Sequence, residues 1–163
     1  MDEAARLTAA QHQLELVLGF FGRVDSKLSV VLGIDLAMLG VVFARLSILE
    51  NITWGVFLAG ALFSVLLGYS FLQLFRGSFP VLDGGQTSLI YFRSIGKLRE
   101  SDFLDRYHSL TPAQLADDYL EQTWRNSKIL TIKFDCLKTA YVYMAWAALP
   151  WSIILVSLSG EGQ

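Results

Sequence analysis

The chain has 163 residues, of which 53% are hydrophobic and 17% are charged, and its mean hydropathy is +0.45. A soluble domain usually carries about 25% charged residues, so this composition is typical of a membrane bundle with one small polar region. The formal net charge of −2 argues against a nucleic-acid-binding protein, which typically has a strong basic excess. No nucleic-acid partner is therefore expected.

The N-terminal part of the chain predicts one long helix from about Glu3 to Ile48, because it contains no proline and carries an apolar stripe. Residues 1–27 are polar enough to form a cytoplasmic extension of this helix. Residues 28–48 form the first predicted transmembrane helix, in which Asp35 is the only charged residue before Arg45. A stretch of about twenty apolar residues matches a hydrocarbon core about 30 Å thick.

A second transmembrane helix is predicted at residues 54–75, which contain no charged residue. Gly60, Ser64 and Gly68 recur every four residues along it. Small residues at this spacing allow helices to approach each other closely. The pattern fits packing within one chain and packing between subunits equally well.

The region 76–136 is predicted to be helical and cytoplasmic. Turn residues occur at 77–80 and 83–85, and two short helices are expected at 88–98 and 101–109, the second with Ser101 as its N-cap. The sequence Thr111-Pro112-Ala113-Gln114 is a capping box with proline at the first helical position, which predicts a last helix of about 45 residues. Its final part, residues 137–158, is the third predicted transmembrane helix.

The predicted fold is therefore an all-α integral membrane protein with three transmembrane helices, of which the first and last extend into a small helical cytoplasmic domain. The distribution of Lys and Arg predicts the orientation, because basic residues accumulate on the cytoplasmic side. Residues 76–138 contain nine of the 13 basic residues, whereas residues 49–53 and 160–163 contain none. The N-terminus and the central region are expected in the cytoplasm and the C-terminus outside.

Asp35 requires an explanation, because a carboxylate inside a span costs about 2.5–3.5 kcal/mol on insertion scales. It should face the interior of the bundle or a partner subunit. In one interpretation it is a gating residue that lines a pore, or a carboxylate kept protonated. In the other it is a hydrogen-bonded interior polar group without a further role, and the sequence leaves both open.

A second set of polar and aromatic residues is predicted near the cytoplasmic side of the membrane. Their charges, amides and aromatic rings suit a phosphate and a stacked base, but they also suit a solvated face with ordinary ion pairs. The candidate ligand-binding residues are Asp25, Lys27, Tyr91, Phe92, Arg93, Gln122, Arg125, Asn126, Lys128 and Lys133.

The sequence contains no pattern typical of catalysis or metal binding. It lacks a P-loop, a glycine-rich fingerprint, H-E-x-x-H and G-x-S-x-G. His12 and His108 are expected on exposed helix faces, and the single cysteine, Cys136, is expected to pack as a small apolar residue. No catalytic residue, metal or cofactor is therefore expected, and the chain is not expected to be an enzyme.

Several stretches of the chain carry a family resemblance. They are Tyr91–Leu98 followed by Ser101–Phe103, Gln122–Ile129 continuing to Tyr141, and, upstream, Asp25–Lys27 with Leu32–Asp35. Through these stretches, residues 14–155 resemble the Pycsar effectors, the transmembrane effectors of bacterial anti-phage defence by pyrimidine cyclic nucleotides. That family often has Asn at the position of Asp35.

The resemblance implies a sequence of events in the bacterial inner membrane. A partner cyclase makes cyclic UMP or cyclic CMP after phage infection, and the effector binds this ligand on its cytoplasmic face, with 76–136 as the sensor region. A homo-oligomer of the effector then impairs membrane integrity, which causes growth arrest or cell death. The alternative is a non-enzymatic membrane anchor or accessory subunit of a membrane complex.

The predicted topology can be tested with reporter fusions. Alkaline phosphatase, which is active only outside the cytoplasm, should be active when fused after Gln163 and inactive when fused after Ser109, because the basic residues retain the central region inside. Activity in the two fusions is compared in intact cells. A fusion after Gln163 that scores as cytoplasmic would contradict the prediction.

Overall fold

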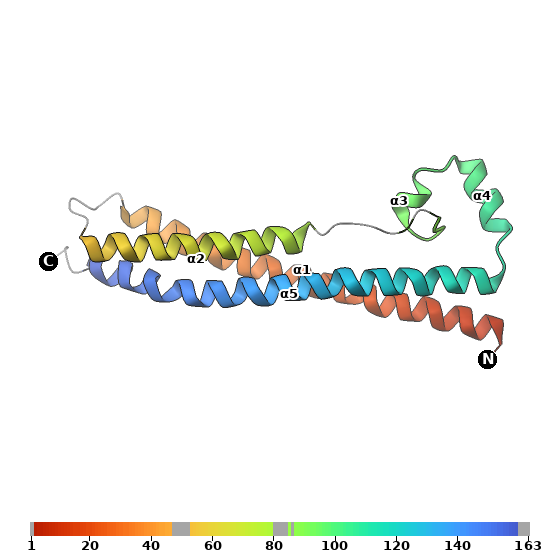
Figure 1. The fold of residues 1–163 in the computed structure, drawn as a ribbon, viewed down its shortest axis with the longest axis horizontal. Coiled ribbons are helices and arrows are strands. Elements are labelled where there is room, and N and C mark those ends of the chain that lie inside the picture. Colours follow the sequence, from red (N-terminus) through yellow and green to blue (C-terminus); the bar gives the residue numbers. More distant parts are fainter. Residues whose placement is uncertain (1, 47–52, 80–84, 86, 160–163) are drawn as a thin grey trace. The chain divides into compact units, whose positions relative to one another are not determined.

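In the computed structural model the chain is described for residues 2–46, 53–79, 85 and 87–159. This part is helical and contains no strand, so the predicted all-α fold is confirmed. Five helices follow one another along the described residues (Figure 1): α1 (Glu3–Leu46), α2 (Trp54–Ser78), α3 (Phe92–Ile95), α4 (Glu100–His108) and α5 (Pro112–Ser159). The predicted end of the first helix at Ile48 lies outside the described residues.

The chain forms two compact units. Unit 1 comprises Met1–Arg23 and Pro80–Ile132, and therefore contains the first part of α1, the short helices α3 and α4, and the first part of α5. Unit 2 comprises Val24–Phe79 and Lys133–Gln163, and contains the rest of α1, all of α2 and the rest of α5. The helices α1 and α5 thus contribute to both units.

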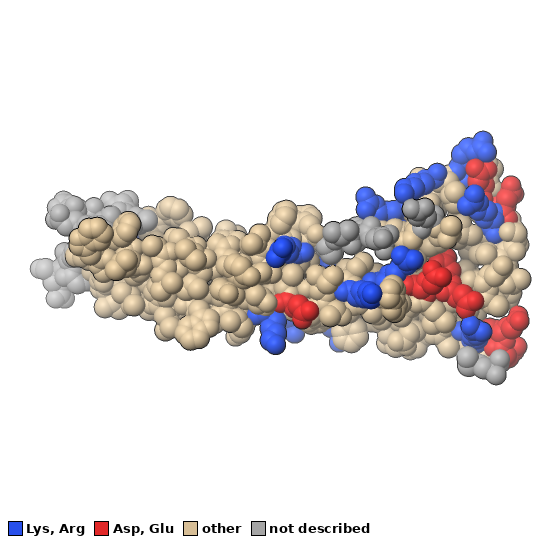
Figure 2. Space-filling model, in the orientation of Figure 1, with Lys and Arg blue, Asp and Glu red and all other residues tan. Residues whose placement is uncertain are grey.

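Three helices are long and apolar enough to cross a membrane, over Glu3–Arg45, Trp54–Ser78 and Pro112–Ser157. Their outward side chains in unit 2 are apolar, with Val65 70% exposed and Val156 73% exposed. On the face shown in Figure 2, α2 and the helix segments beside it carry almost no charged side chain. Because lipid is the solvent that accepts such a surface, the protein is an integral membrane protein with three transmembrane helices.

Within unit 2, α1 and α5 run in the same direction and α2 runs in the opposite direction (Figure 1). Phe63, Ala140 and Ile154 are buried in the core of this bundle. At one end the three helices meet at Gly77, where an added Cβ would lie 3.2 Å from Cys136 Cβ and 3.3 Å from Leu28 Cδ2. A turn was predicted at 77–80, but Gly77 and Ser78 belong to α2, so the prediction is wrong at these two residues. Residues 80, 83 and 84, where turns were also predicted, lie outside the described residues.

Asp35 is completely buried inside the bundle of unit 2. This was predicted, because exposing a carboxylate to lipid costs free energy. The hydroxyl of Ser70 in α2 donates a hydrogen bond to Asp35 Oδ2 at 2.6 Å and lies 3.2 Å from the carbonyl oxygen of Ala140 in α5. The second carboxylate oxygen, Oδ1, is buried and has no hydrogen-bond partner among the described residues. This cluster joins all three helices at one level of the bundle.

Further along the bundle, Trp151 of α5 joins α1 through its indole Nε1, which donates to the carbonyl oxygen of Met38 at 3.1 Å. Trp151 follows Pro150, which lies inside α5 without ending the helix. Proline has no backbone N–H, so α5 lacks one of its internal hydrogen bonds at this point. Neighbouring helices make such a proline acceptable in a membrane span.

The small residues of α2 leave open space beside them among the described residues. A Cβ added at Gly60 or Gly68 would meet no described atom of another helix within 4 Å. Ser64 is exposed, and its hydroxyl donates to the carbonyl oxygen of Gly60 at 2.8 Å. The described residues thus show no close helix approach at Gly60 or Gly68, and packing between subunits stays a prediction.

Unit 1 is built on the first parts of α1 and α5. Arg6 forms an ion pair with Asp117 at 2.8 Å, and Gln11 Nε2 donates to the Tyr119 hydroxyl at 3.3 Å. The predicted capping box at the start of α5 is confirmed, because Gln114 N donates to Thr111 Oγ1 at 3.3 Å and Thr111 N donates to Gln114 Oε1 at 2.9 Å.

The two short helices differ from their predicted bounds. Instead of a helix over 88–98, only Phe92–Ile95 is helical, because Ser88 Oγ accepts from the backbone N–H groups of Ile90 and Tyr91 and holds them in a turn. Ser101 is not an N-cap. The helix begins one residue earlier at Glu100, with an extended Arg99 (φ −73°, ψ 151°) as the preceding residue.

Candidate functional site

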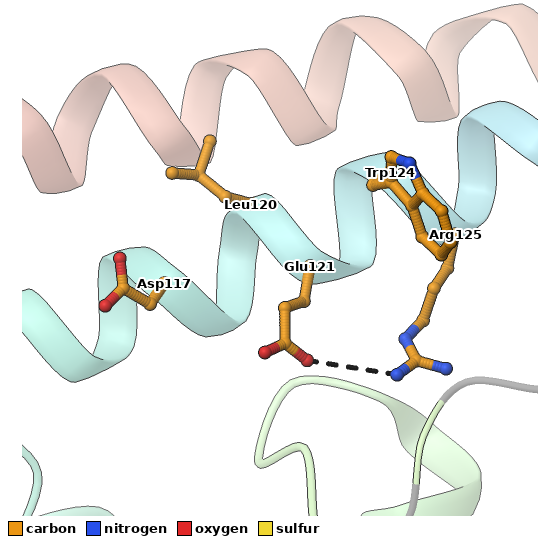
Figure 3. Close-up of a pocket in the computed structure, with 5 residues that line it drawn as sticks. All are labelled: Asp117, Leu120, Glu121, Trp124 and Arg125. Atoms are coloured by element: carbon orange, nitrogen blue, oxygen red, sulfur yellow. Dashed lines mark ion pairs between the residues drawn. The ribbon is translucent and has the colours of Figure 1, made fainter.

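One face of α5 in unit 1 forms a hollow of about 620 Å³ (Figure 3). Its lining side chains recur at intervals of three and four residues, which places them on the same side of one helix. They are Asp117, Leu120, Glu121, Trp124 and Arg125. The hollow therefore offers an arginine, an indole and two carboxylates within two turns of helix.

Cationic side chains flank the indole of this hollow. Trp124 is 58% exposed, so a large part of its ring faces solvent. One turn further along α5, Lys128 lies over the ring with its Nζ 3.9 Å from the centroid. Because an ammonium group over an indole is attracted to the negative face of the ring, this contact holds Lys128 beside the hollow.

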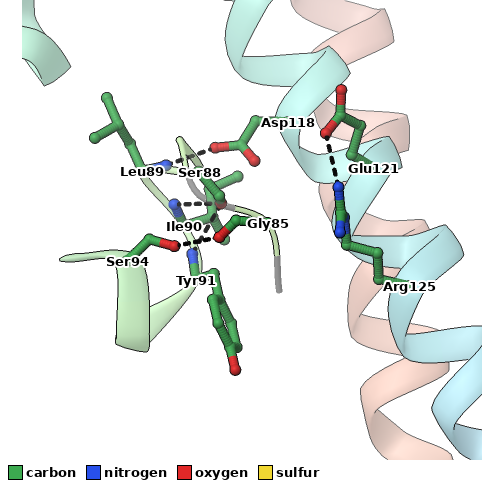
Figure 4. Close-up of polar contacts among 9 residues, drawn as sticks. All are labelled: Gly85, Ser88, Leu89, Ile90, Tyr91, Ser94, Asp118, Glu121 and Arg125. Atoms are coloured by element: carbon green, nitrogen blue, oxygen red, sulfur yellow. Dashed lines mark hydrogen bonds and ion pairs between the residues drawn. The ribbon is translucent and has the colours of Figure 1, made fainter. Parts of the chain in front are cut away.

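The guanidinium group of Arg125 lies near Glu121 and Gly85. Glu121 lies one helical turn before Arg125 and forms a long ion pair with it at 3.9 Å (Figures 3 and 4). At Gly85, an added Cβ would come 3.1 Å from Arg125 Nη2. Gly85 also has a φ of +82°, which L side chains rarely adopt. Glycine at this position thus allows both the turn and the close approach of the guanidinium group.

The segment that follows Gly85 is attached to α5 by polar contacts (Figure 4). The backbone N–H of Leu89 donates to Asp118 Oδ2 at 2.9 Å. Ser94 of α3 donates to the carbonyl oxygen of Gly85 at 2.8 Å, which closes the segment on itself. These bonds fix Gly85 near Arg125 and so help to position the guanidinium group.

The chemistry of the hollow suits a small anion that carries a planar ring. A guanidinium group binds a phosphate through charge-assisted hydrogen bonds, and an exposed indole provides a stacking surface. A second hollow, of about 280 Å³, shares Asp117 and Glu121 with the first but has Asp118 in place of a basic lining residue, so it suits an anion less well. Among the described residues, no group of three or more His, Cys, Asp or Glu could hold a metal ion.

Two of the predicted ligand-binding residues, Arg125 and Lys128, lie in or beside the hollow. The predicted amide residues face other partners: Gln122 is only 3% exposed, and Asn126 Nδ2 donates to the carbonyl oxygen of Gln122 at 2.8 Å. That Gln122 and Asn126 form hydrogen bonds with the base of a bound nucleotide stays a prediction.

The three predicted residues around α3 do not line the hollow. The rings of Tyr91 and Phe92 pack against each other with centroids 5.0 Å apart. The Tyr91 hydroxyl is buried and has no hydrogen-bond partner among the described residues. Phe92 and Arg93 are exposed.

The remaining predicted residues, Asp25, Lys27 and Lys133, belong to unit 2. Lys133 forms an ion pair with Asp25, and its side chain is only 6% exposed whereas that of Asp25 is 51% exposed. The carboxylate therefore neutralises a buried ammonium group, and the predicted ligand-binding role of these two residues stays a prediction. Lys27 is exposed and lines a groove of unit 2 that is described below.

Sequence reasoning missed Trp124 and Glu121, which both line the hollow. The spacing offered a signal, because Trp124 directly precedes Arg125 and lies four residues before Lys128 on the same helix. An exposed tryptophan followed closely by two basic residues on one helix is more typical of a binding surface than of a solvated face.

The sequence model of one family, described as the Pycsar effector protein domain, matches residues 9–159. The chain belongs to the Pycsar effector family. The predicted resemblance is thereby confirmed, and this Pycsar effector is a transmembrane protein of anti-phage defence in the inner membrane. No curated protein and no solved structure significantly matches the chain.

The unequal burial of the Asp25–Lys133 pair predicts unequal effects of its two substitutions. Asp25→Asn leaves a buried ammonium group without its carboxylate partner, and should destabilise the effector by about 1–3 kcal/mol. Lys133→Met should cost less, because the remaining carboxylate is half exposed and is hydrated. Thermal unfolding in mild detergent measures both variants.

The control for this comparison is Arg99→Gln, which removes an exposed ion pair with Asp102 at 3.0 Å and should change stability little. A larger loss of stability in Lys133→Met than in Asp25→Asn would show that burial does not decide the cost.

Proposed function

We propose that this Pycsar effector binds a cyclic pyrimidine nucleotide, cyclic CMP or cyclic UMP made by a partner cyclase, and then impairs the inner membrane. The observation that carries the proposal is the hollow on α5, which presents Arg125, Trp124 and Lys128 on a helix that continues as a transmembrane span. Loss of membrane integrity would stop growth or kill the infected cell before the phage matures. In this proposal the effector is not an enzyme and uses no cofactor.

The hollow has the size and the groups that such a ligand needs. Ligand sites typically have volumes of about 300–1,000 Å³, and the hollow has about 620 Å³. The cyclic phosphate carries one negative charge, which Arg125 and Lys128 neutralise. The base stacks on Trp124, a contact that contributes about 1–3 kcal/mol per base in other proteins.

Helix α5 transmits the binding event in this proposal. It is one helix from Pro112 to Ser159, and we propose that a displacement at Arg125 is passed along it to the span. Shifts of about 1–2 Å are ordinary for helices in switching proteins. The ligand must bind the active arrangement more tightly than the resting one, because otherwise it cannot change their populations.

Asp35 is the proposed gating residue. In the described arrangement its Oδ1 atom is buried without a hydrogen-bond partner among the described residues, which is costly for a polar atom in a dry bundle. The carbonyl oxygen of Ala140, on α5, lies next to the Ser70 hydroxyl that holds the other carboxylate oxygen. Movement of α5 therefore acts directly on this cluster, and an opened bundle would hydrate Asp35.

A homo-oligomer completes the proposal, because three helices cannot easily enclose a conducting pore alone. The stripe of small residues on α2 supports contact between subunits, since no described atom of another helix lies within 4 Å of a Cβ added at Gly60 or Gly68. Gly60 and Ser64 also line a groove of about 370 Å³ whose other lining residues are apolar.

Nucleotide binding can be measured by calorimetry on the full chain in mild detergent. Cyclic CMP or cyclic UMP should bind, whereas cyclic AMP and cyclic GMP should bind more weakly. Arg125→Gln should lower the affinity about ten- to a hundredfold, because a charge-assisted phosphate contact contributes about 1.5–3 kcal/mol. Trp124→Leu, at a side chain that is 58% exposed, should also weaken binding without affecting the fold.

The matched control is Arg106→Gln, which removes an exposed arginine of α4 and should leave affinity unchanged. Wild-type affinity in both Arg125→Gln and Trp124→Leu would show that the ligand binds elsewhere. Absence of saturable binding for every cyclic nucleotide would favour the alternative function, a membrane anchor or accessory subunit.

The gating role of Asp35 can be tested by dye release from vesicles. Asp35→Leu should retain nucleotide binding and lose nucleotide-triggered release, because an apolar side chain removes the buried carboxylate whose hydration would favour the opened bundle. Asp35→Asn keeps a polar group at this position and should retain release.

Two measurements on the same preparation separate gating from folding, namely calorimetric binding and dye release. Full release by Asp35→Leu would make Asp35 a packing residue and would contradict the gating role. Loss of both binding and release in that variant would also contradict it, since the expected effect is confined to the membrane.

A further inference from the structure

We infer that unit 2 binds an anionic phospholipid in a groove between α1 and α5, with the headgroup at Lys27 and Lys138. The groove has a volume of about 450 Å³. Two lysines occur in its lining, one from each helix, and the other lining side chains are apolar or aromatic. This combination matches a phospholipid, which has an anionic group at one end and hydrocarbon along the rest.

The two lysines are available for an external anion. Both are exposed, and neither forms an ion pair among the described residues. The nearby Lys133 differs from them, because it is buried and paired with Asp25. The groove therefore presents two positive charges whose counter-ion is not a described residue of the chain.

The rest of the groove suits an acyl chain. It is lined on α1 by Val30 and Val31, and on α5 chiefly by Phe134, Leu137 and Tyr141. Val30 is 63% exposed and Tyr141 is 58% exposed, so the groove is open to the hydrocarbon of the membrane. An acyl chain that lies in it covers apolar surface, while the long lysine stems let the ammonium groups reach the headgroup level.

Charge decides which lipid occupies the groove. The residues of unit 2 at this end of the spans (24–28, 76 and 133–138) include four basic and two acidic side chains. A zwitterionic headgroup adds a positive charge next to the two lysines, whereas phosphatidylglycerol adds only its phosphate. Basic pockets between transmembrane helices are known to hold anionic headgroups. The occupant is therefore an anionic phospholipid.

Native mass spectrometry of the full chain in mild detergent tests this site, with dioleoyl phosphatidylglycerol as the probe and no nucleotide present. Each lysine near a headgroup contributes about 1 kcal/mol, so Lys27→Gln with Lys138→Gln should weaken binding roughly thirtyfold. A bulky residue in the groove, Val30→Trp, should also weaken binding while both charges remain.

Three controls distinguish binding in this groove from non-specific electrostatic attraction of the lipid to the protein. Dioleoyl phosphatidylcholine, with the same acyl chains, should bind weakly to the wild type. Arg45→Gln with Lys97→Gln removes two positive charges outside the groove and should leave phosphatidylglycerol binding unchanged. Inorganic phosphate should not displace the lipid, because it cannot occupy the apolar part of the groove.

Several results would overturn the inference. They are wild-type affinity of the lysine double variant for phosphatidylglycerol, equal binding of the two lipids, equal weakening by the control double variant, and displacement by phosphate. The last result would indicate a site for free anions. None of these measurements depends on nucleotide binding, so the lipid site and the proposed function succeed or fail separately.

Discussion

The Asp35–Ser70 hydrogen bond is the interaction on which the arrangement of the spans depends. A carboxylate in lipid is costly, so α1 can cross the membrane only if another helix covers Asp35 and supplies a donor. Ser70 supplies it from α2, and the Ala140 carbonyl oxygen brings α5 to the same level. One polar contact thus fixes how the three helices are aligned along their axes, which apolar packing alone specifies weakly because lipid is as apolar as the side chains.

The spans and the start of α5 were predictable from sequence, because each depends on residues that are close together in the chain. Long uncharged stretches indicate spans because no other structure satisfies the backbone in lipid. The start of α5 was predictable from Thr111 and Gln114, since a capping box needs only four consecutive residues. The burial of Asp35 was predictable from the free-energy cost of exposing a carboxylate to lipid, but its hydrogen-bond partner was not. Ser70 is 35 residues away, and its position depends on how α1 and α2 are aligned.

The errors have the same origin in contacts that sequence does not reveal. The short α3 was predicted too long because Ser88 competes for backbone donors and Asp118, 29 residues away, accepts from Leu89. The pairing of Lys133 with Asp25, 108 residues away, was likewise not visible in the sequence, and the role of Lys133 in ligand binding stays a prediction. Arg125 could be predicted as a candidate ligand-binding residue from its charge, whereas Trp124 becomes a candidate only through its exposure, which a helical pattern alone does not give.

The proline in α5 has a mechanical consequence. A helix bends most easily where one of its internal hydrogen bonds is missing, so the flexural stiffness of α5 is lowest around Pro150. Ala140 lies ten residues before this point, in a part of the span without proline. Just beyond Pro150, Trp151 ties α5 to the Met38 carbonyl of α1. The part of the span that carries Ala140 is therefore stiffer than the part around Pro150, and bending of α5 would be concentrated near its C-terminal end.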